Sequence, residues 1–331
     1  MRAVVIHEHG GRDKLILEDV PDPVPKPGEI LLRVRAVGLN YLDIFVRRGM
    51  PSLHIDLPRI SGGDIAGEVV ALGEGVQSVE VGQRLLIDPA ITMPDGTGGA
   101  LGESATGGLS EYFAISADNA IPLPVDVTYE QAAALPIAYG TAWRMLITRG
   151  RLGAGESILI LGASGGVGTG AVQIAKMLGC EVFAAASSPD KLAQLKDLGA
   201  DHAVNYIEHP EFHRYIRSIR DGEGVDVVVN YTGGDSWVRS LKAVKHGGRI
   251  LTCGATAGFD PPTDIRYIWR REMDILGSDG WRRQDLIELL DAVRQDSIIP
   301  VIGAVLPLEG TAEGHRLLED REIFGKVIIT P

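Results

Sequence analysis

Cysteine is scarce in this chain, because only Cys180 and Cys253 occur among its 331 residues. Two cysteines do not make the disulfide framework of a small secreted domain, so we expect a reducing, cytoplasmic environment. Long apolar runs are missing too, since none approaches the roughly 18–20 residues that span a bilayer. The first residues, Met1–His7, are typical of a strand rather than of a signal peptide. We therefore predict no membrane partner.

Positive charge is also in deficit. The chain has 32 Lys and Arg against 44 Asp and Glu, a formal net charge of −12, and no run rich in Lys or Arg. A nucleic-acid-binding protein usually carries a basic patch or stripe, so we predict no nucleic acid partner. The length suits about two domains with cores of their own.

What the chain does contain is a glycine-rich turn between a strand and a helix. An apolar, β-branched run from Ile158 leads into the pattern Ala163-x-Gly165-x-x-Gly168, with Ala at the usual first Gly, and a helical pattern follows. Residues without bulky side chains let the backbone approach a dinucleotide pyrophosphate, and the first helical turn offers free N–H groups. Taken alone the pattern also suits an ordinary tight strand–helix turn.

More strands and helices alternate downstream of this turn. Strands are predicted at Glu181–Ala186, Val225–Asn230, Arg249–Gly254 and Met273–Gly277. After the first of these, Ser188 suits a helix N-cap, Pro189 the first helical position and Gly199 the C-terminal cap. Because helical segments separate most of the strands, residues 123–280 are predicted to form an α/β domain with a doubly wound, parallel sheet of the Rossmann type.

The first 122 residues have a different pattern, with short strands joined by proline and glycine. Strands at Ile30–Val37, Ile65–Gly73 and Arg84–Ile87 predict an antiparallel, barrel-like β domain. After residue 280 come a helix near Gln284–Arg294 and a last strand, Lys326–Thr330. We expect residues 281–331 to return to the N-terminal domain.

Several motifs occur in the order found in one family. They are Val37-Gly38-Leu39-Asn40-Tyr41-Leu42-Asp43, Gly62-Gly63-Asp64-Ile65-Ala66-Gly67, Gly107-Gly108-Leu109-Ser110-Glu111-Tyr112 and the turn at 163–168. Over its whole length the chain resembles the medium-chain dehydrogenase/reductase superfamily, in the branches of quinone-oxidoreductase-like and alcohol-dehydrogenase-like proteins. The resemblance implies a GroES-like β-barrel catalytic domain beside the Rossmann domain, with the active site in the cleft between them.

The zinc branch of this family has its metal-binding residues at positions that differ here. The resemblance implies that Asn40 stands at a Cys ligand, Gly63 at a His ligand and Leu42 at a proton-relaying hydroxyl. A catalytic zinc needs about three N, S or O ligands, so no metal is predicted. The segment 88–103, which matches a four-cysteine lobe, has no Cys. We expect a glycine-rich loop there, without structural zinc.

The cofactor preference follows from the end of the second strand. NAD-preferring folds usually place Asp or Glu there for the ribose 2′-hydroxyl, whereas this chain has Ala186-Ser187-Ser188. In the quinone oxidoreductases that it resembles, a small residue, a Lys and a Tyr hold the 2′-phosphate, and Ser187, Lys191 and Tyr206 have that spacing. We predict NADPH, although a solvated helix lysine and a core tyrosine are the plain alternatives.

The resemblance also implies the remaining cofactor contacts. Thr141 packs against the nicotinamide, the turn from Gly254 to Thr256 holds its carboxamide, Thr232 lies beneath the adenine-side ribose, and Lys326 reaches across the cleft. The predicted cofactor-binding residues are Thr141, Ala163, Ser164, Gly165, Gly166, Val167, Gly168, Ser187, Ser188, Lys191, Tyr206, Thr232, Gly254, Ala255, Thr256 and Lys326.

Asn40, Tyr41 and Asp43 are the candidate catalytic residues, on a segment that faces the nicotinamide in this family. Tyr41 and Asp43 can transfer protons, and Asn40 or backbone N–H groups can donate to a developing oxyanion. Asp43 can equally cap the following helix. Phe45 stands where related enzymes often have Tyr.

Without a metal to polarise a carbonyl, we predict NADPH-dependent hydride transfer to a quinone or an activated alkene, such as an enone or enoyl thioester. Two alternatives are an alcohol dehydrogenase or aldehyde reductase with an oxygen-rich metal site from Asn40, Asp43, His54 and Asp64, and a non-catalytic NADPH-binding sensor.

Two further expectations concern partners. Met273–Gly277 is expected to be an exposed sheet edge, which proteins usually protect. In the resembling family such edges pair, so we predict a homodimer or a dimer of dimers. The arginines near this strand are Arg266, Arg270, Arg271, Arg282 and Arg283. They suit ordinary ion pairs, or, for Arg282 and Arg283, attraction of an anionic acceptor.

Overall fold

In the computed structural model, which describes residues 1–50, 54–93 and 95–331, the glycine turn lies in a sheet of six parallel strands. The strands are β11 Ser157–Ile160, β12 Glu181–Ala186, β13 His202–Asn205, β14 Val225–Val229, β15 Val244–Thr252 and β16 Asp274–Gly277. Their order, β13-β12-β11-β14-β15-β16, confirms the predicted doubly wound sheet. The sequence patterns missed β13, because this edge strand has only four residues and a polar residue at each end.

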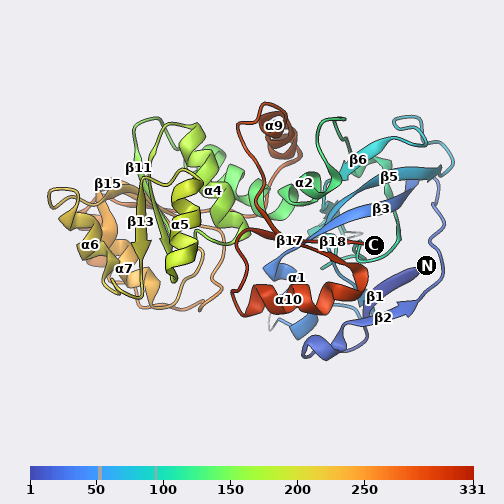
Figure 1. Cartoon of the computed structure of the whole chain (residues 1–331), viewed down its shortest axis with the longest axis horizontal. Coiled ribbons are helices and arrows are strands. Elements are labelled where there is room, and N and C mark those ends of the chain that lie inside the picture. The colour runs from blue at the N-terminus through green and yellow to red at the C-terminus, as the bar shows by residue number, and fades with distance from the viewer. Residues whose placement is uncertain (51–53, 94) are drawn as a thin grey trace. The chain divides into compact units, whose positions relative to one another are not determined.

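Helices cover both faces of this sheet. They are α3 Thr141–Trp143, α4 Gly166–Met177, α5 Pro189–Asp197, α6 Phe212–Ser218, α7 Ser236–Ala243 and α8 Ile265–Arg270, together with the π-helical segment η4 Arg144–Arg149. In Figure 1, α4 and α5 lie on one side of the strands and α6 and α7 on the other. The core beneath α6 and α7 is apolar, with Phe212, Ile216 and Leu241 packed against Phe183 and Val228.

The other unit is built on a mainly antiparallel sheet in the order β10-β6-β5-β3-β18-β17, with β9 also paired to β3. The strands of this unit are β1 Arg2–Ile6, β2 Ile16–Asp19, β3 Glu29–Leu39, β4 Arg59–Ile60, β5 Asp64–Leu72, β6 Arg84–Ile87, β7 Ala90–Thr92, β8 Gly98–Ala100, β9 Tyr112–Ser116, β10 Ala120–Pro122, β17 Ile302–Pro307 and β18 Lys326–Thr330. The long strand β3 pairs with β5, β9 and the C-terminal strand β18, whereas β1 pairs with β2 and β4 in a separate three-stranded sheet. This confirms the predicted β domain.

Helices and short helical turns complete this second sheet's unit. They are η1 Arg12–Lys14, α1 Tyr41–Arg48, η2 Ala117–Asn119, α2 Tyr129–Ala133, α9 Arg283–Arg294, η5 Leu308–Gly310 and α10 Thr311–Glu319. The other unit begins within the π-helical segment η3 Leu135–Gly140. The unit comprises Met1–Ala138, Arg282–Asp296 and Pro300–Pro331, and the other unit Tyr139–Trp281 and Ser297–Ile299. The first stretch extends beyond residue 122 because α2 packs on β3 and β5.

The segment 88–103 is more regular than the loop expected from its glycines. Ala90–Thr92 and Gly98–Ala100 pair as an antiparallel hairpin. At its turn the Thr97 amide donates to the Asp95 carboxylate at 2.9 Å, and the Met93 amide donates to the Thr97 carbonyl at 2.8 Å. Pro94 lies outside the described residues. Local hydrogen bonds of Asp95 and Thr97 therefore stabilise the turn of this segment, which has no cysteine to bind a structural zinc.

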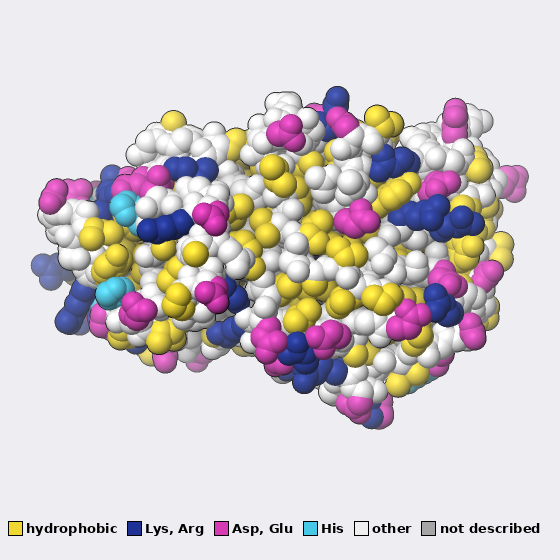
Figure 2. Space-filling model, viewed as in Figure 1, with side chains coloured by type: hydrophobic (Ala, Val, Ile, Leu, Met, Phe, Trp, Pro, Cys, Tyr) yellow, Lys and Arg dark blue, Asp and Glu magenta, His cyan; other side chains and the backbone are white. Residues whose placement is uncertain are grey.

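Charges of both signs are mixed on the surface. Figure 2 shows Lys and Arg side chains interspersed with Asp and Glu on the face that it presents, and many of them form ion pairs. Within the described ranges, no helix is both long enough and apolar enough to cross a membrane.

Candidate functional site

The turn between β11 and α4 exposes backbone and little else. Gly165 is the N-cap of α4 and caps it with no side-chain hydrogen bond. Residues 164–167 are half-buried, whereas Ala163 and Gly168 are buried. A Cβ at Gly168 would lie 2.4 Å from the Gly162 carbonyl oxygen, so only glycine lets the helix pack this closely on the strand. The N–H groups of this first turn suit a pyrophosphate.

The residues predicted to hold a 2′-phosphate are near the ends of β12 and of the edge strand β13. Strands β12 and β13 run parallel with Ala186 opposite Asn205, and the Tyr206 amide donates to the Ala186 carbonyl at 3.2 Å. Ser187 is exposed at the end of β12, and the Ser188 hydroxyl caps α5 by accepting from the Lys191 amide at 3.4 Å. Ser187 and Tyr206 therefore follow the ends of two adjacent strands, and Lys191 lies in the first turn of the helix after β12.

A buried asparagine that sequence reasoning missed organises the turn after β14. The Asn230 side-chain oxygen accepts from the amides of Thr232 and Gly233, each at 3.0 Å, and its amide group donates to Ser240 at 2.9 Å. The available signal was a polar residue that ends an otherwise apolar strand. The Ala257 amide donates to the Thr232 carbonyl at 2.7 Å, so this turn is joined to the one after β15, where Gly254 and Thr256 are exposed.

Tyr231 is a second residue that the sequence did not single out. Its hydroxyl donates to the Gly162 carbonyl at 2.7 Å, and burial raises the pKa of this phenol, which therefore stays neutral. The bond connects the β14 turn to the glycine turn. Thr141, the residue predicted to lie against the nicotinamide, is buried at the start of α3 in the same unit.

In the other unit, Asn40, Asp64 and Lys326 form one buried cluster. Asn40 follows β3. Asp64 is the first residue of β5 and pairs with Gly38 of β3, and Lys326 is the first residue of β18, in which the next residue, Val327, pairs with Leu39 of β3. The Lys326 ammonium donates to the Asn40 side-chain oxygen at 2.6 Å and to the Asp64 carboxylate at 3.1 Å. Burial raises the pKa of Asp64, and the ammonium and the Asn40 amide oppose that rise. Lys326, predicted as a cofactor contact, is only 2% exposed.

Both amide hydrogens of Asn40 are used inside the protein. One goes to the Asp64 carboxylate at 2.8 Å and the other to the Gly38 carbonyl at 3.2 Å. The side-chain amide therefore has no hydrogen left for a substrate oxyanion in this conformation.

A catalytic zinc does not fit these residues. The oxygens of Asn40 and Asp64 already accept from the Lys326 ammonium, whose charge opposes a cation. A Cβ at Gly63 would lie 2.6 Å from the Leu101 carbonyl oxygen, so a longer ligand side chain has no space there. His54 pairs with Asp56 at 3.1 Å instead. Over residues 1–50, 54–93 and 95–331, no group of three His, Cys, Asp or Glu side chains is placed to hold a metal.

Asp43 performs the capping role that sequence reasoning gave as its alternative. Its carboxylate accepts from the backbone N–H of Asn40 at 2.7 Å and from the backbone N–H of Gly62 at 2.8 Å, and the side chain is buried. Burial raises the pKa of Asp43 to about 6, and the two amide hydrogen bonds limit the rise. Asp43 thus fixes the start of α1 and the β5 turn together.

Tyr41 differs from these neighbours because its side chain is half-buried rather than enclosed. Its ring meets Phe45 edge-to-face, with centroids 5.4 Å apart. No hydrogen bond to another residue of the described ranges holds the Tyr41 hydroxyl. Among the three candidate catalytic residues, Tyr41 alone keeps a side-chain proton available.

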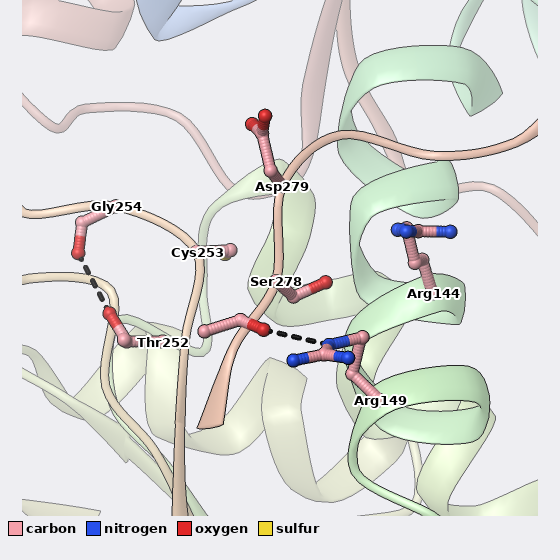
Figure 3. Close-up of a pocket in the computed structure, with 8 residues that line it drawn as sticks. Arg144, Arg149, Thr252, Cys253, Gly254, Ser278 and Asp279 are labelled. Atoms are coloured by element: carbon pink, nitrogen blue, oxygen red, sulfur yellow. Dashed lines mark hydrogen bonds between the residues drawn. The ribbon is translucent and has the colours of Figure 1, made fainter. Parts of the chain in front are cut away.

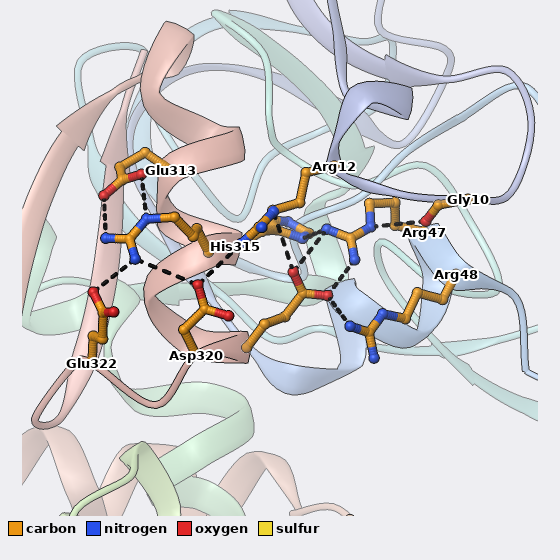
Figure 4. Close-up of polar contacts among 10 residues, drawn as sticks. Gly10, Arg12, Arg47, Arg48, Glu313, His315, Asp320 and Glu322 are labelled. Carbon is orange, nitrogen blue, oxygen red and sulfur yellow. Dashed lines mark hydrogen bonds and ion pairs between the residues drawn. The ribbon is translucent and has the colours of Figure 1, made fainter.

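A buried ion-pair cluster anchors the helix that carries Tyr41 (Figure 4). Arg47 on α1 is 1% exposed and pairs with Glu319 at the end of α10, which Arg48 also contacts at 2.6 Å. Arg47 also donates to the Gly10 carbonyl at 3.2 Å. Burial lowers the pKa of the neighbouring His315 to about 3, so this imidazole is neutral beside the guanidinium groups.

Most of the arginines near β16 have structural partners. Arg266 pairs with Asp264, Arg271 donates to three backbone carbonyls, and Arg283 donates to the carbonyls of Asp118 and Ala120. Arg283 is therefore committed to the backbone rather than free to attract an anionic acceptor. Arg282 is exposed.

A Rossmann sheet with an open glycine turn, next in sequence to a GroES-like β unit, defines a nicotinamide-dependent oxidoreductase class. Family models described as "Alcohol dehydrogenase GroES-like domain" and "Zinc-binding dehydrogenase" match residues 26–125 and 166–295. Quinone oxidoreductase of Mus musculus is 33% identical, over 99% of this chain and 97% of its own. The chain belongs to the medium-chain dehydrogenase/reductase superfamily.

Two solved structures extend the comparison. A structure titled NAD-dependent alcohol dehydrogenase is 38% identical with a TM-score of 0.94, and each chain is covered completely. The 2-octenoyl-CoA carboxylase reductase CinF, in complex with NADP and 2-octenoyl-CoA, is 29% identical with a TM-score of 0.86, over 96% of this chain and 82% of its own. Members of this superfamily bind a nicotinamide cofactor.

Proposed function

We propose that this protein is an NADPH-dependent, zinc-independent oxidoreductase that transfers hydride to a small-molecule quinone or activated alkene. The observation that carries the proposal is the Lys326–Asn40–Asp64 cluster, in which Asn40, at a position that the resemblance gives to a zinc ligand, is already bonded to an ammonium group and a carboxylate. Without Lewis-acid help, the acceptor must already be electron-poor, as a quinone or an enone is.

The cofactor preference rests on the strand ends of β12 and β13. Ser187 and Tyr206 follow those strand ends, Lys191 lies in the first turn of α5, and Ala186 leaves no carboxylate to repel a 2′-phosphate. The glycine turn provides the N–H groups for the pyrophosphate. The bound cofactor supplies the hydride.

The protein's own residues provide position and a proton. Tyr41 is the proposed donor to the acceptor oxygen, because its hydroxyl is not bound to the described residues, whereas the protons of Asn40 are engaged. Asp43 and the Arg47–Glu319 pair are positioning residues that hold α1 in place. For a quinone, one hydride and one proton enter, and the products are hydroquinone and NADP⁺.

The test is a screen of 1,4-naphthoquinone, a neutral enone, crotonyl-CoA and an aldehyde, each with NADPH and with NADH, before and after dialysis against a strong chelator. We expect turnover of the quinone or an alkene with NADPH that survives chelation. Chelator-sensitive aldehyde or alcohol turnover would support the metal alternative, and NADPH binding without any turnover would support the sensor.

A further inference from the structure

The Rossmann unit contains a hollow of about 530 Å³ at the carboxyl ends of β15 and β16. Its lining includes Arg144 and Arg149 from η4, Gly254 after β15, and Ser278 after β16. Figure 3 shows both arginines projecting from one helix beside the strand ends, with the Ser278 hydroxyl directed toward that helix. Ligands of open α/β sheets bind at this end of the strands.

Two polar side chains of this hollow lack a partner within the described residues. The Nε and Nη1 atoms of Arg144 are buried and make no hydrogen bond, and the same holds for Ser278 Oγ on a side chain that is 8% exposed. A guanidinium stays charged at any ordinary pH. Burying its N–H groups unpaired is costly, so these groups suit a ligand that accepts hydrogen bonds.

The charge around the hollow favours an anion. Arg149 forms no ion pair with a described residue and donates through Nε to the Gly277 carbonyl at 2.9 Å. Asp279 is the one carboxylate of the lining; it forms no ion pair with a described residue and points away from Arg149 in Figure 3. Cys253 adds no negative charge, because burial raises the pKa of its thiol to about 12. Two guanidinium charges therefore face one carboxylate.

The position of the hollow indicates which molecule carries the anion. The predicted 2′-phosphate site lies at β12 and β13, on the opposite flank of the sheet from β15 and β16. Gly254, which lines the hollow, is also the first residue of the turn predicted to hold the nicotinamide carboxamide. An anion here is therefore next to the reacting end of the cofactor and away from its phosphates.

We propose that Arg144 and Ser278 form a binding site for a compact oxyanion of the acceptor, a carboxylate or a phosphate. This inference rests on the proposed function and narrows it to acceptors that carry such a group near the electron-poor carbon. A planar guanidinium matches a carboxylate or a phosphate through paired N–H donors. The hydroxyl of Ser278 adds one more donor.

The test compares (E)-4-oxopent-2-enoate with its methyl ester, which present the same enone with and without a charge. The C=C bond gains hydride from NADPH at the carbon β to the ketone and a proton at the α carbon, leaving NADP⁺ and the saturated keto compound. Variants are Arg144→Gln, Ser278→Ala and, as a matched control, Arg33→Gln, an exposed arginine on β3 in the other unit.

We expect Arg144→Gln to raise KM for the acid by about 10- to 100-fold and Ser278→Ala by about 2- to 10-fold, with the ester unchanged. Arg33→Gln should change neither. With saturating NADPH, inorganic phosphate should compete with the acid in the parent and lose this effect in Arg144→Gln. Equal changes for acid and ester, or none for either, would overturn the site.

Two measurements keep the proposal testable if Arg144→Gln fails to fold. Ser278→Ala and phosphate competition in the parent still decide it, since absent competition contradicts an anion site. Equilibrium dialysis of the acid against the parent and Ser278→Ala needs no turnover. If neither the ester nor any quinone is reduced with either cofactor, the proposed function fails; if they are reduced but acid binding ignores Ser278 and Arg144, only the oxyanion site fails.

Discussion

In the Rossmann unit residues 164–167 of the glycine turn are half-buried, whereas in the GroES-like unit Asn40, Asp64 and Lys326 are buried and bonded to one another. The first region is the proposed binding place of the cofactor pyrophosphate, a ligand that is not part of the chain. The second has already used its polar groups on itself. Polar side chains in a family's active-site segment are therefore poor evidence of a catalytic role until their partners are known.

The contrast extends to how each region is stabilised. The glycine turn depends on small residues and close backbone packing, so a larger side chain would destabilise it by steric clash. The cluster of Asn40, Asp64 and Lys326 and the Arg47–Glu319 pair depend on buried charges, for which removal of one partner leaves an unpaired ion. The following predictions test this difference, from the largest expected effect to the smallest.

Glu319→Gln should lower the unfolding free energy of the protein by about 3–5 kcal/mol, because Arg47 would remain buried with a weakened partner. Glu313→Gln, on the same helix, removes only an exposed pair with Arg316 and should cost about 0–1 kcal/mol. Urea denaturation of both variants measures the difference. Equal losses would mean that burial does not set the strength of these pairs.

Asp43→Asn should alter the pH dependence of stability. The raised pKa of Asp43, about 6 against 3.8, means that the folded protein keeps a proton which the unfolded chain releases. Protonated Asp43 therefore contributes to the unfolding free energy fully below pH 4. As the pH rises to 6 this contribution, about 3 kcal/mol, is lost. Denaturation of parent and variant between pH 4 and 7 should show the parent losing stability relative to the variant. A constant difference would show that Asp43 has an ordinary pKa.

Lys191→Ala should weaken the binding of NADPH by about 10- to 100-fold, since hydrogen bonds to charged groups contribute about 1.5–3 kcal/mol. NADH should hardly change, because it lacks the 2′-phosphate. Lys196→Ala, at the other end of α5, is the matched control. Fluorescence titration with both cofactors provides the measurement, and parallel losses for NADPH and NADH would remove Lys191 from the phosphate site.

Gly168→Ala should destabilise the Rossmann unit by about 1–3 kcal/mol and impair binding of both cofactors, because its Cβ would meet the Gly162 oxygen. At Gly165 the nearest atom to an added Cβ is 3.7 Å away, so Gly165→Ala should fold normally. Calorimetric melting and cofactor titration compare the two. If both variants behave alike, close helix–strand packing is not what the last glycine provides.

The smallest effect on the unfolding free energy is expected for a substitution on β16, the edge strand of the Rossmann sheet. Ile275 on β16 is 37% exposed, and we predict that β16 pairs with a second copy in a homodimer or a dimer of dimers. Ile275→Lys should dissociate the assembly in light scattering and change unfolding of the separated chain by less than about 0.5 kcal/mol. Val125→Lys, at an exposed position of the other unit, is the control. A monomeric parent at micromolar concentration would contradict the prediction.

Sequence patterns predicted the Rossmann sheet well, apart from β13. The glycine spacing, the Ser188–Pro189 helix start and the apolar strands are local features whose physical causes lie within a few residues. The same holds for β18, predicted at Lys326–Thr330 and found there. The hairpin at 88–103 was missed because it depends on hydrogen bonds of Asp95 and Thr97 that composition does not reveal.

The pairing of polar groups was beyond sequence reasoning. Asn40 and Asp64 are 24 positions apart, and Lys326 is 262 positions from Asp64, so their contacts exist only because β3, β5 and β18 lie side by side in one register. Arg47 and Glu319 meet in the same way across 272 positions. Local spacing was enough to specify strands, helices and the glycine turn, because each forms from near neighbours. Which charged and amide groups satisfy one another, and which remain for a ligand, depended on strand pairing and burial across the whole chain.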